Sequence, residues 1–201
     1  MDPPGFPASE RDLDDLAEDV IGQLIEGELI VHPRPDSPHT QAAADLASVI
    51  LPAFRRGSGG PGGWVILFEP KIRLGRDLLV PDLAGWRKER FVDPQKGPYL
   101  VVPDWVCEIL SLSTARDDRI RKLPIYARDG VRRVWLLDPR LRTLEVFRLH
   151  EGRWLLIGTY QGEDKVRAEP FEAVEIDLSM IWSDLPVENE DEEENKEPAG
   201  S

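Results

Sequence analysis

The sequence has a single cysteine, Cys107, among its 201 residues, which excludes a framework of intramolecular disulfides. Its three histidines (His32, His39 and His150) lack the spacing of zinc ligands. No apolar run approaches the length of a membrane span, and no charged-then-apolar signal segment stands at the start. We therefore expect a soluble, cytoplasmic protein that does not associate with membranes.

An excess of positive charge is also missing. The formal net charge is −13 at pH 7, which counts against a general nucleic-acid-binding surface. Seven acids and one lysine between Glu188 and Glu197 supply part of this charge, but the remaining chain is still acidic. Any contact with nucleic acid must therefore be local or assisted by a metal ion. The glycine-rich segment 57–63 lacks the Gly-Lys-Ser/Thr ending of a phosphate loop, so it does not indicate one.

The length and the hydrophobic fraction of 41% suit one domain with its own core. The composition predicts a flexible N-terminus at 1–8, a folded domain at 9–187 and a disordered acidic tail at 188–201. Hydrophobic periodicity predicts helices at 10–24, 38–54 and 115–128. It predicts strands at 26–32, 64–68, 71–74, 80–86, 105–110, 131–137, 143–149 and 153–160, followed by a last strand and a short helix within 171–185. This mixture favours an α/β or α+β fold, with a β-sheet flanked by helices.

Two predicted strands each carry one acid among apolar residues. Glu108 lies within Trp105-Val106-Cys107-Glu108-Ile109-Leu110, and Asp82 lies within Leu79-Val80-Pro81-Asp82-Leu83-Ala84. Burying an ionised carboxylate is costly unless a metal or a hydrogen-bonded partner compensates. Two such carboxylates on neighbouring strands could share one cation, so a metal-dependent hydrolase site is the first hypothesis.

The helix predicted after the Glu108 strand adds a basic group. Lys122 and Tyr126 are four residues apart and share a helical face with Asp118. If that helix packs against the sheet, it can bring the Lys122 ammonium near the carboxylates. Pro124 falls inside the same helix and should kink or restart it, because proline removes a backbone hydrogen bond.

Taken together, these motifs resemble the putative restriction endonuclease family, common in cyanobacteria and actinobacteria, within the PD-(D/E)xK nuclease superfamily. The resemblance rests on the order of several motifs and covers about Ile25 to Leu185, with Glu26-Gly27-Glu28-Leu29 and His39 matching the usual start of the family. The motifs are Val80-Pro81-Asp82, Glu108-Ile109-Leu110-Ser111-Leu112-Ser113-Thr114, Arg121-Lys122-Leu123, Tyr126-Ala127, Gly130-Val131 and Trp135-Leu136-Leu137-Asp138-Pro139.

The resemblance implies a restriction-endonuclease-like mixed sheet flanked by helices, and an endonuclease that hydrolyses phosphodiester bonds in DNA. Asp82 and Glu108 would be the metal-binding carboxylates, and Mg²⁺, with Mn²⁺ as the alternative, would be the ion. In the wider superfamily a lysine stands two positions after the second acid, where this chain has Leu110. The family is thought to use a lysine on the following helix, which would be Lys122. Weaker candidates for the site are Glu69, Glu28, Tyr126 and His39.

Each candidate also has a purely structural interpretation. Asp82 can cap a turn after proline, and Glu108 can pair with Arg132 or Arg133. Lys122 can form a solvated helix pair with Asp118, since such pairs are common and weak. Tyr126 can be a packing residue, and His39 can be a surface residue at a helix start.

Two other functions stay open at this point. The acidic body and Pro124 are compatible with a catalytically weak or inactive nuclease fold that binds nucleic acid or protein. The acidic tail is compatible with an interaction protein that mimics nucleic acid or recruits a basic partner. A restriction role would need a homodimer to cut both strands of DNA, and the sequence carries no signature of an oligomer.

Overall fold

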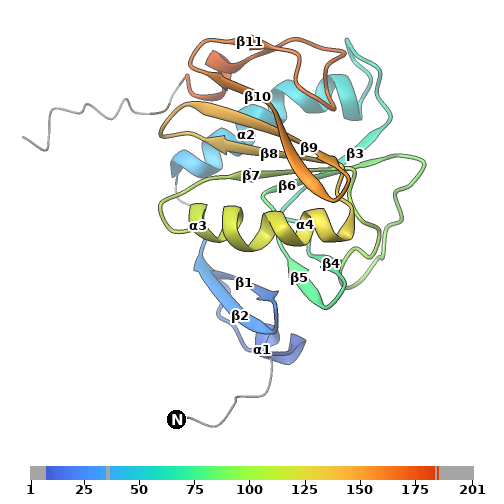
Figure 1. Cartoon of the computed structure of the whole chain (residues 1–201), viewed down its shortest axis with the longest axis vertical. Coiled ribbons are helices and arrows are strands. Elements are labelled where there is room, and N and C mark those ends of the chain that lie inside the picture. Colours follow the sequence, from blue (N-terminus) through green and yellow to red (C-terminus); the bar gives the residue numbers. More distant parts are fainter. Residues whose placement is uncertain (1–7, 35–36, 184, 186–201) are drawn as a thin grey trace, which may run out of the picture.

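A six-stranded mixed sheet forms the centre of the computed structural model, which describes residues 8–34, 37–183 and 185 (Figure 1). The strand order is β10-β9-β8-β7-β6-β3, and only β7 and β8 of these neighbours run parallel. The bounds are β3 Trp64–Phe68, β6 Leu83–Arg87, β7 Trp105–Ile109, β8 Arg133–Asp138, β9 Thr143–His150 and β10 Arg153–Gln161. The predicted fold class, a mixed sheet flanked by helices, is confirmed.

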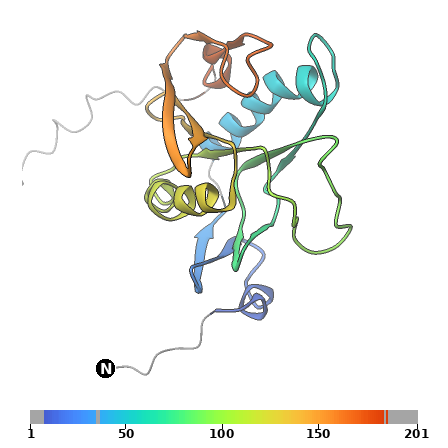
Figure 2. The same cartoon turned by 45° about the vertical axis from the view of Figure 1, so that its right-hand side comes forward.

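Helices cover both faces of this sheet (Figures 1 and 2). On one face lies α2 (Ser37–Ile50), which continues into η1 (Leu51–Arg55). On the other lie α3 (Ala115–Asp117), η2 (Asp118–Lys122) and α4 (Leu123–Asp129), which end at Gly130 in a left-handed conformation. Side chains alternate along β7, so Trp105 and Cys107 pack on the α2 side and Val106 on the α4 side. Glu108 therefore faces the α4 side.

A second sheet of four short strands has the order β2-β1-β5-β4. Its strands are β1 Val20–Ile25, β2 Glu28–Pro33, β4 Ile72–Leu74 and β5 Asp77–Leu79. The strand predicted at 80–86 is wrong over 80–82, which belong to no strand: β5 ends at Leu79 in this sheet, and β6 begins at Leu83 in the central one. Proline has no N–H for a strand ladder, and Pro81 stands where the chain passes from one sheet to the other.

The helix predicted at 10–24 is also wrong beyond its first turn and a half. The structure has a short helix, α1 (Glu10–Asp14), and then the strand β1. The Ser9–Asp12 capping box is present. Leu13 and Leu16 fold back onto β1 at Gly22, where an added Cβ would lie 2.2 Å from Leu16. The helical spacing in the sequence therefore combines apolar residues of two elements, the α1 segment and strand β1, which pack against each other.

Pro124 does not displace the helix that carries Lys122. In η2 the chain forms a wide π-helical turn, in which the Leu123 N–H donates to the Asp118 carbonyl, and α4 then begins with Pro124 in its first turn. Proline fits there because the first N–H groups of a helix lack partners within it. The backbone stays helical through Lys122 and Leu123, so the helix widens for one turn and neither kinks away nor restarts, and Lys122 stays on the face that packs on the sheet.

The end of the described chain packs on the α2 side. It contains β11 (Lys165–Val166), β12 (Ile176–Asp177) and η3 (Leu178–Ile181). The predicted last strand and short helix are present, whereas β11 was not predicted. The flexible N-terminus predicted at 1–8 falls outside the described residues except for Ala8, and the tail predicted at 188–201 lies wholly outside them. No helix in the described part is long and apolar enough to cross a membrane.

Candidate functional site

Glu108 is buried in the middle of the molecule, with a 1% exposed surface. Its Oε2 lies 3.1 Å from the Lys122 ammonium, and its Oε1 accepts a hydrogen bond of 2.5 Å from the Tyr126 hydroxyl. The prediction that a helix would bring Lys122 to this carboxylate agrees with these distances. The structural alternative that paired Glu108 with Arg132 or Arg133 is wrong, since Arg133 binds Glu169 and Arg132 approaches Asp104.

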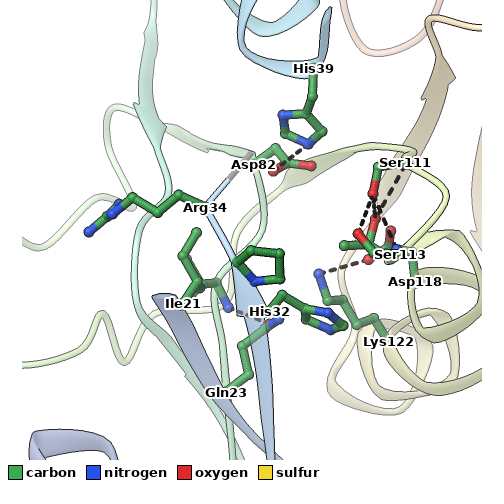
Figure 3. A pocket seen from close by; sticks show the side chains of 13 residues that line it. Ile21, Gln23, His32, Arg34, His39, Asp82, Ser111, Ser113, Asp118 and Lys122 are labelled. Carbon is green, nitrogen blue, oxygen red and sulfur yellow. Dashed lines mark hydrogen bonds and ion pairs between the residues drawn. The ribbon is translucent and has the colours of Figure 1, made fainter. Parts of the chain in front are cut away.

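Asp82 lies just before β6, at the end of the sheet toward which β7 runs. Its Oδ2 accepts a hydrogen bond of 2.6 Å from the backbone N–H of Ile109, the residue after Glu108. Its Oδ1 lies 3.1 Å from Nε2 of His39, which comes from the first turn of α2 (Figure 3). Asp82 is thus held near Glu108 by one contact from β7 and one from α2.

Lys122 sits between two carboxylates. Besides Glu108, its ammonium lies 2.8 Å from Oδ1 of Asp118. Lys122 is 4% exposed and Asp118 1% exposed, so the pair is buried. The alternative from the sequence, a solvated ion pair on the helix surface, is therefore wrong. The sequence placed Asp118 on the face of Lys122 and Tyr126 but gave it no role in the site beyond that pair. The signal that could have singled it out is its place on the same helical face as Lys122 and Tyr126.

A pocket of about 120 Å³ opens beside these groups (Figure 3). One side is formed by the β1–β2 hairpin and the chain after it, through Ile21, Gln23, His32, Pro33 and Arg34. The other side is formed by residues from α2, the connection between β5 and β6, the loop after β7, and η2. These residues are His39, Val80, Asp82, Ser111, Ser113, Thr114, Asp118 and Lys122. Glu108 is not among the lining residues; its carboxylate oxygens contact Lys122, which lines the pocket, and Tyr126, which does not.

The weaker candidates fall into two groups. Tyr126 and His39 are buried and contact Glu108 and Asp82, so the expectation of a surface position for His39 is wrong. Glu28 is 66% exposed, pairs with Arg121 at 2.6 Å and lies outside the pocket lining. Glu69 pairs with Arg34 at 3.6 Å and lines a neighbouring pocket together with His39 and Asp82. The structure therefore places Tyr126 and His39 in contact with the acidic site residues Glu108 and Asp82, and leaves Glu28 and Glu69 at the periphery of the site.

The buried charges shift each other's pKa. Burial raises the pKa of Glu108 to about 8, and the negative charges of Asp118 and Asp82 add to the rise, while the Lys122 ammonium and the Tyr126 hydroxyl oppose it. Burial lowers the pKa of Lys122, but Asp118, Glu108 and Asp82 outweigh it and raise that pKa above its ordinary value. Both shifts act in one direction: they favour the charged form of Lys122 and the protonated form of Glu108.

This shift predicts that stability falls as pH rises. Between the unfolded pKa of 4.5 and the folded pKa of about 8, folded Glu108 holds a proton that the unfolded chain has lost. The unfolding free energy of the metal-free protein should therefore decrease across this range, by about 1 kcal/mol or more relative to Glu108→Gln. Urea unfolding of both proteins at a series of pH values measures the difference. Parallel pH profiles would show that Glu108 does not titrate in this range.

The donor set fits a hard divalent cation held by few protein ligands. Asp82 and Glu108 offer carboxylate oxygens. When Glu108 is ionised, it and Asp118, which both contact the Lys122 ammonium, together with Asp82 nearby outnumber that single positive charge. In the described part of the chain, no three His, Cys, Asp or Glu side chains are grouped as a metal cage. Mg²⁺ often takes one or two carboxylates and fills its remaining positions with water and substrate phosphate, so such a cage is not required.

Two comparisons with known proteins found a match. A family model named Uma2 and described as "Putative restriction endonuclease" matches residues 11–180. A crystal structure of "a putative nuclease belonging to DUF820" from Anabaena variabilis superposes with a TM-score of 0.71 at 20% identity, covering 90% of this chain and 98% of the other. That likeness shows the fold. No match was found among curated proteins.

Proposed function

Because the chain belongs to the Uma2 family of "putative restriction endonucleases", we propose that it is a metal-dependent endonuclease that hydrolyses phosphodiester bonds in DNA. The observation that carries this proposal is the Lys122 ammonium, which lines a pocket beside Asp82 and lies 3.1 Å from buried Glu108. The Lys122 ammonium can bind a substrate phosphate, and the carboxylates of Asp82 and Glu108 can bind a cation.

Each residue has a role that its position supports. Asp82 and Glu108 would hold Mg²⁺ or Mn²⁺, and such an ion polarises the scissile phosphate and lowers the pKa of an attacking water. Lys122 would bind a phosphate oxygen and stabilise the negative charge that grows on it. His39 and the Ile109 N–H fix the two oxygens of Asp82, so this carboxylate needs little rearrangement before it acts.

A second candidate function is a binding module with this fold and no turnover. The observation that favours it is that both oxygens of Glu108 already contact protein groups, Lys122 and Tyr126, and that Glu108 does not line the pocket. A protein of this kind would bind nucleic acid or protein without cleavage that depends on a metal. The homodimer and the cytoplasmic location expected from the sequence stay predictions.

Calorimetric titration with Mg²⁺ and Mn²⁺ tests the metal site. We expect the parent to bind, and Asp82→Asn and Glu108→Gln to bind on the order of tenfold more weakly or worse, because each loses one anionic ligand. Asp104→Asn is a matched control. Asp104 is also a buried acid, it precedes β7 at the opposite end from Ile109, and it pairs with Arg90. If all four proteins bind alike, or none binds, the carboxylates do not form a metal site.

A further inference from the structure

Asp118 is a buried acid that depends on one partner. Its side chain is 1% exposed, and its Oδ1 lies 2.8 Å from the Lys122 ammonium. In the part of the chain that the structure describes, neither oxygen of Asp118 has a hydrogen bond from any other group. A buried carboxylate without a partner is strongly unfavourable, so Asp118 and Lys122 hold each other in place.

The helix fixes the two residues relative to one another. Asp118 begins the wide turn η2 and Lys122 ends it, and the Leu123 N–H closes this turn on the Asp118 carbonyl. Their side chains therefore emerge on one face, toward Glu108 and the pocket. By contrast, Glu108 approaches the ammonium from a separate element, β7.

The Lys122 ammonium contacts two carboxylates, Asp118 and Glu108, which would have different roles once a cation binds. A lysine ammonium has three N–H donors, and two of them face Asp118 and Glu108. A cation bound to Glu108 would repel the ammonium and compete with it for the same oxygens. Lysine has a flexible stem, so without a second anion its amine could leave the pocket wall when Glu108 takes a cation.

We infer that Asp118 is a positioning residue that keeps the Lys122 ammonium at the pocket wall when Glu108 is not available to hold it. One consequence of this inference rests on the proposed function: the Lys122 ammonium and a bound cation would occupy the site at the same time. The contact itself does not depend on a metal, so it can be tested separately.

The first test follows the Lys122 ammonium by NMR in the metal-free, ¹⁵N-labelled full chain, with Lys122→Gln identifying its resonance. We expect slow hydrogen exchange in the parent and exchange at least tenfold faster in Asp118→Asn. In Glu108→Gln, which removes the negative charge as a bound cation would neutralise it, the rate should change less than threefold. Asp117→Asn is the control, because this neighbouring acid faces His32 instead, and its rate should equal that of the parent.

Either of two NMR results overturns the inference. One is unchanged exchange in Asp118→Asn. The other is loss of the slow resonance in Glu108→Gln, which would mean that Glu108 alone holds the ammonium. The second result is accessible even if Asp118→Asn does not fold, because Glu108→Gln keeps Asp118.

A double-mutant cycle tests the consequence for metal binding. Asp118→Asn should weaken Mg²⁺ binding about tenfold in the parent, because the ammonium then depends wholly on Glu108, and should change it less than twofold in Lys122→Gln. Equal weakening in both backgrounds would make Asp118 a direct ligand and overturn its action through Lys122. A parent that binds no Mg²⁺ would refute the proposed function, whereas the NMR result would still decide whether Asp118 positions Lys122.

Discussion

Lys122→Gln should destabilise the metal-free protein by about 3–5 kcal/mol, the usual cost of removing one partner from a buried ion pair. Lys122 is the ammonium that both Glu108 and Asp118 face at hydrogen-bond distance, and all three are almost fully buried. Without it, two buried carboxylates face each other and must either stay charged or take up protons. Urea unfolding at pH 8 measures the loss, because ionisation of Glu108 is favoured there more than at lower pH.

Two further proteins make this result specific. Lys165→Gln removes an exposed lysine that pairs with Asp177 at 3.8 Å, and it should change stability little, as surface pairs usually do. Adding Asp118→Asn to Lys122→Gln should recover part of the stability, because one of the two stranded charges is then gone. A small loss in Lys122→Gln, similar to that of Lys165→Gln, would mean that the buried network does not hold the charges described.

Asp82→Asn and Glu108→Gln should each lower the rate of DNA cleavage on the order of 100-fold or more, since a bound ion contributes several kcal/mol to charge stabilisation and each 1.36 kcal/mol is a factor of ten. Both substitutions keep the size of the side chain and remove a negative charge. The measurement is the rate at which supercoiled plasmid becomes nicked or linear under equal protein and metal concentrations.

Asp104→Asn again serves as the control for losing a buried acid. Its carboxylate accepts a hydrogen bond of 2.9 Å from the Arg87 backbone N–H and pairs with Arg90, away from the pocket. Its cleavage rate should stay within a few-fold of the parent once both are shown to be folded. Cleavage by Asp82→Asn at the parental rate would exclude this carboxylate from the reaction.

Glu108 could be found from the sequence because its environment is local. The apolar neighbours Trp105 to Ile109 predict a buried strand, and a buried strand with one acid demands a partner. The same reasoning singled out Asp82, although this residue lies just before β6 and on no strand. Helical spacing from Asp118 through Lys122 to Tyr126 placed these three residues on one face. Helical spacing does not show how deeply that face is buried, so the sequence alone also allows Asp118 to be half of an ordinary surface ion pair.

The errors arose where tertiary contacts override local pattern. Leu13, Leu16, Val20 and Leu24 have helical spacing, yet the last two lie on strand β1, which gains its hydrogen bonds from β2 and β5. His39 lies in the first turn of a helix, a position usually exposed, but here it is buried and contacts Asp82. Partners so far apart in sequence leave no periodic signal, and only the folded chain reveals them.

The most direct test of the central claim is the conversion of supercoiled plasmid by the parent protein with Mg²⁺ or Mn²⁺, beside the same reaction in excess chelator. A metal-dependent endonuclease converts the plasmid with the ion present and leaves it intact with chelator, and Glu108→Gln leaves it intact in both. Plasmid that stays supercoiled with either ion, or cleavage that the chelator and Glu108→Gln do not reduce, would contradict the account.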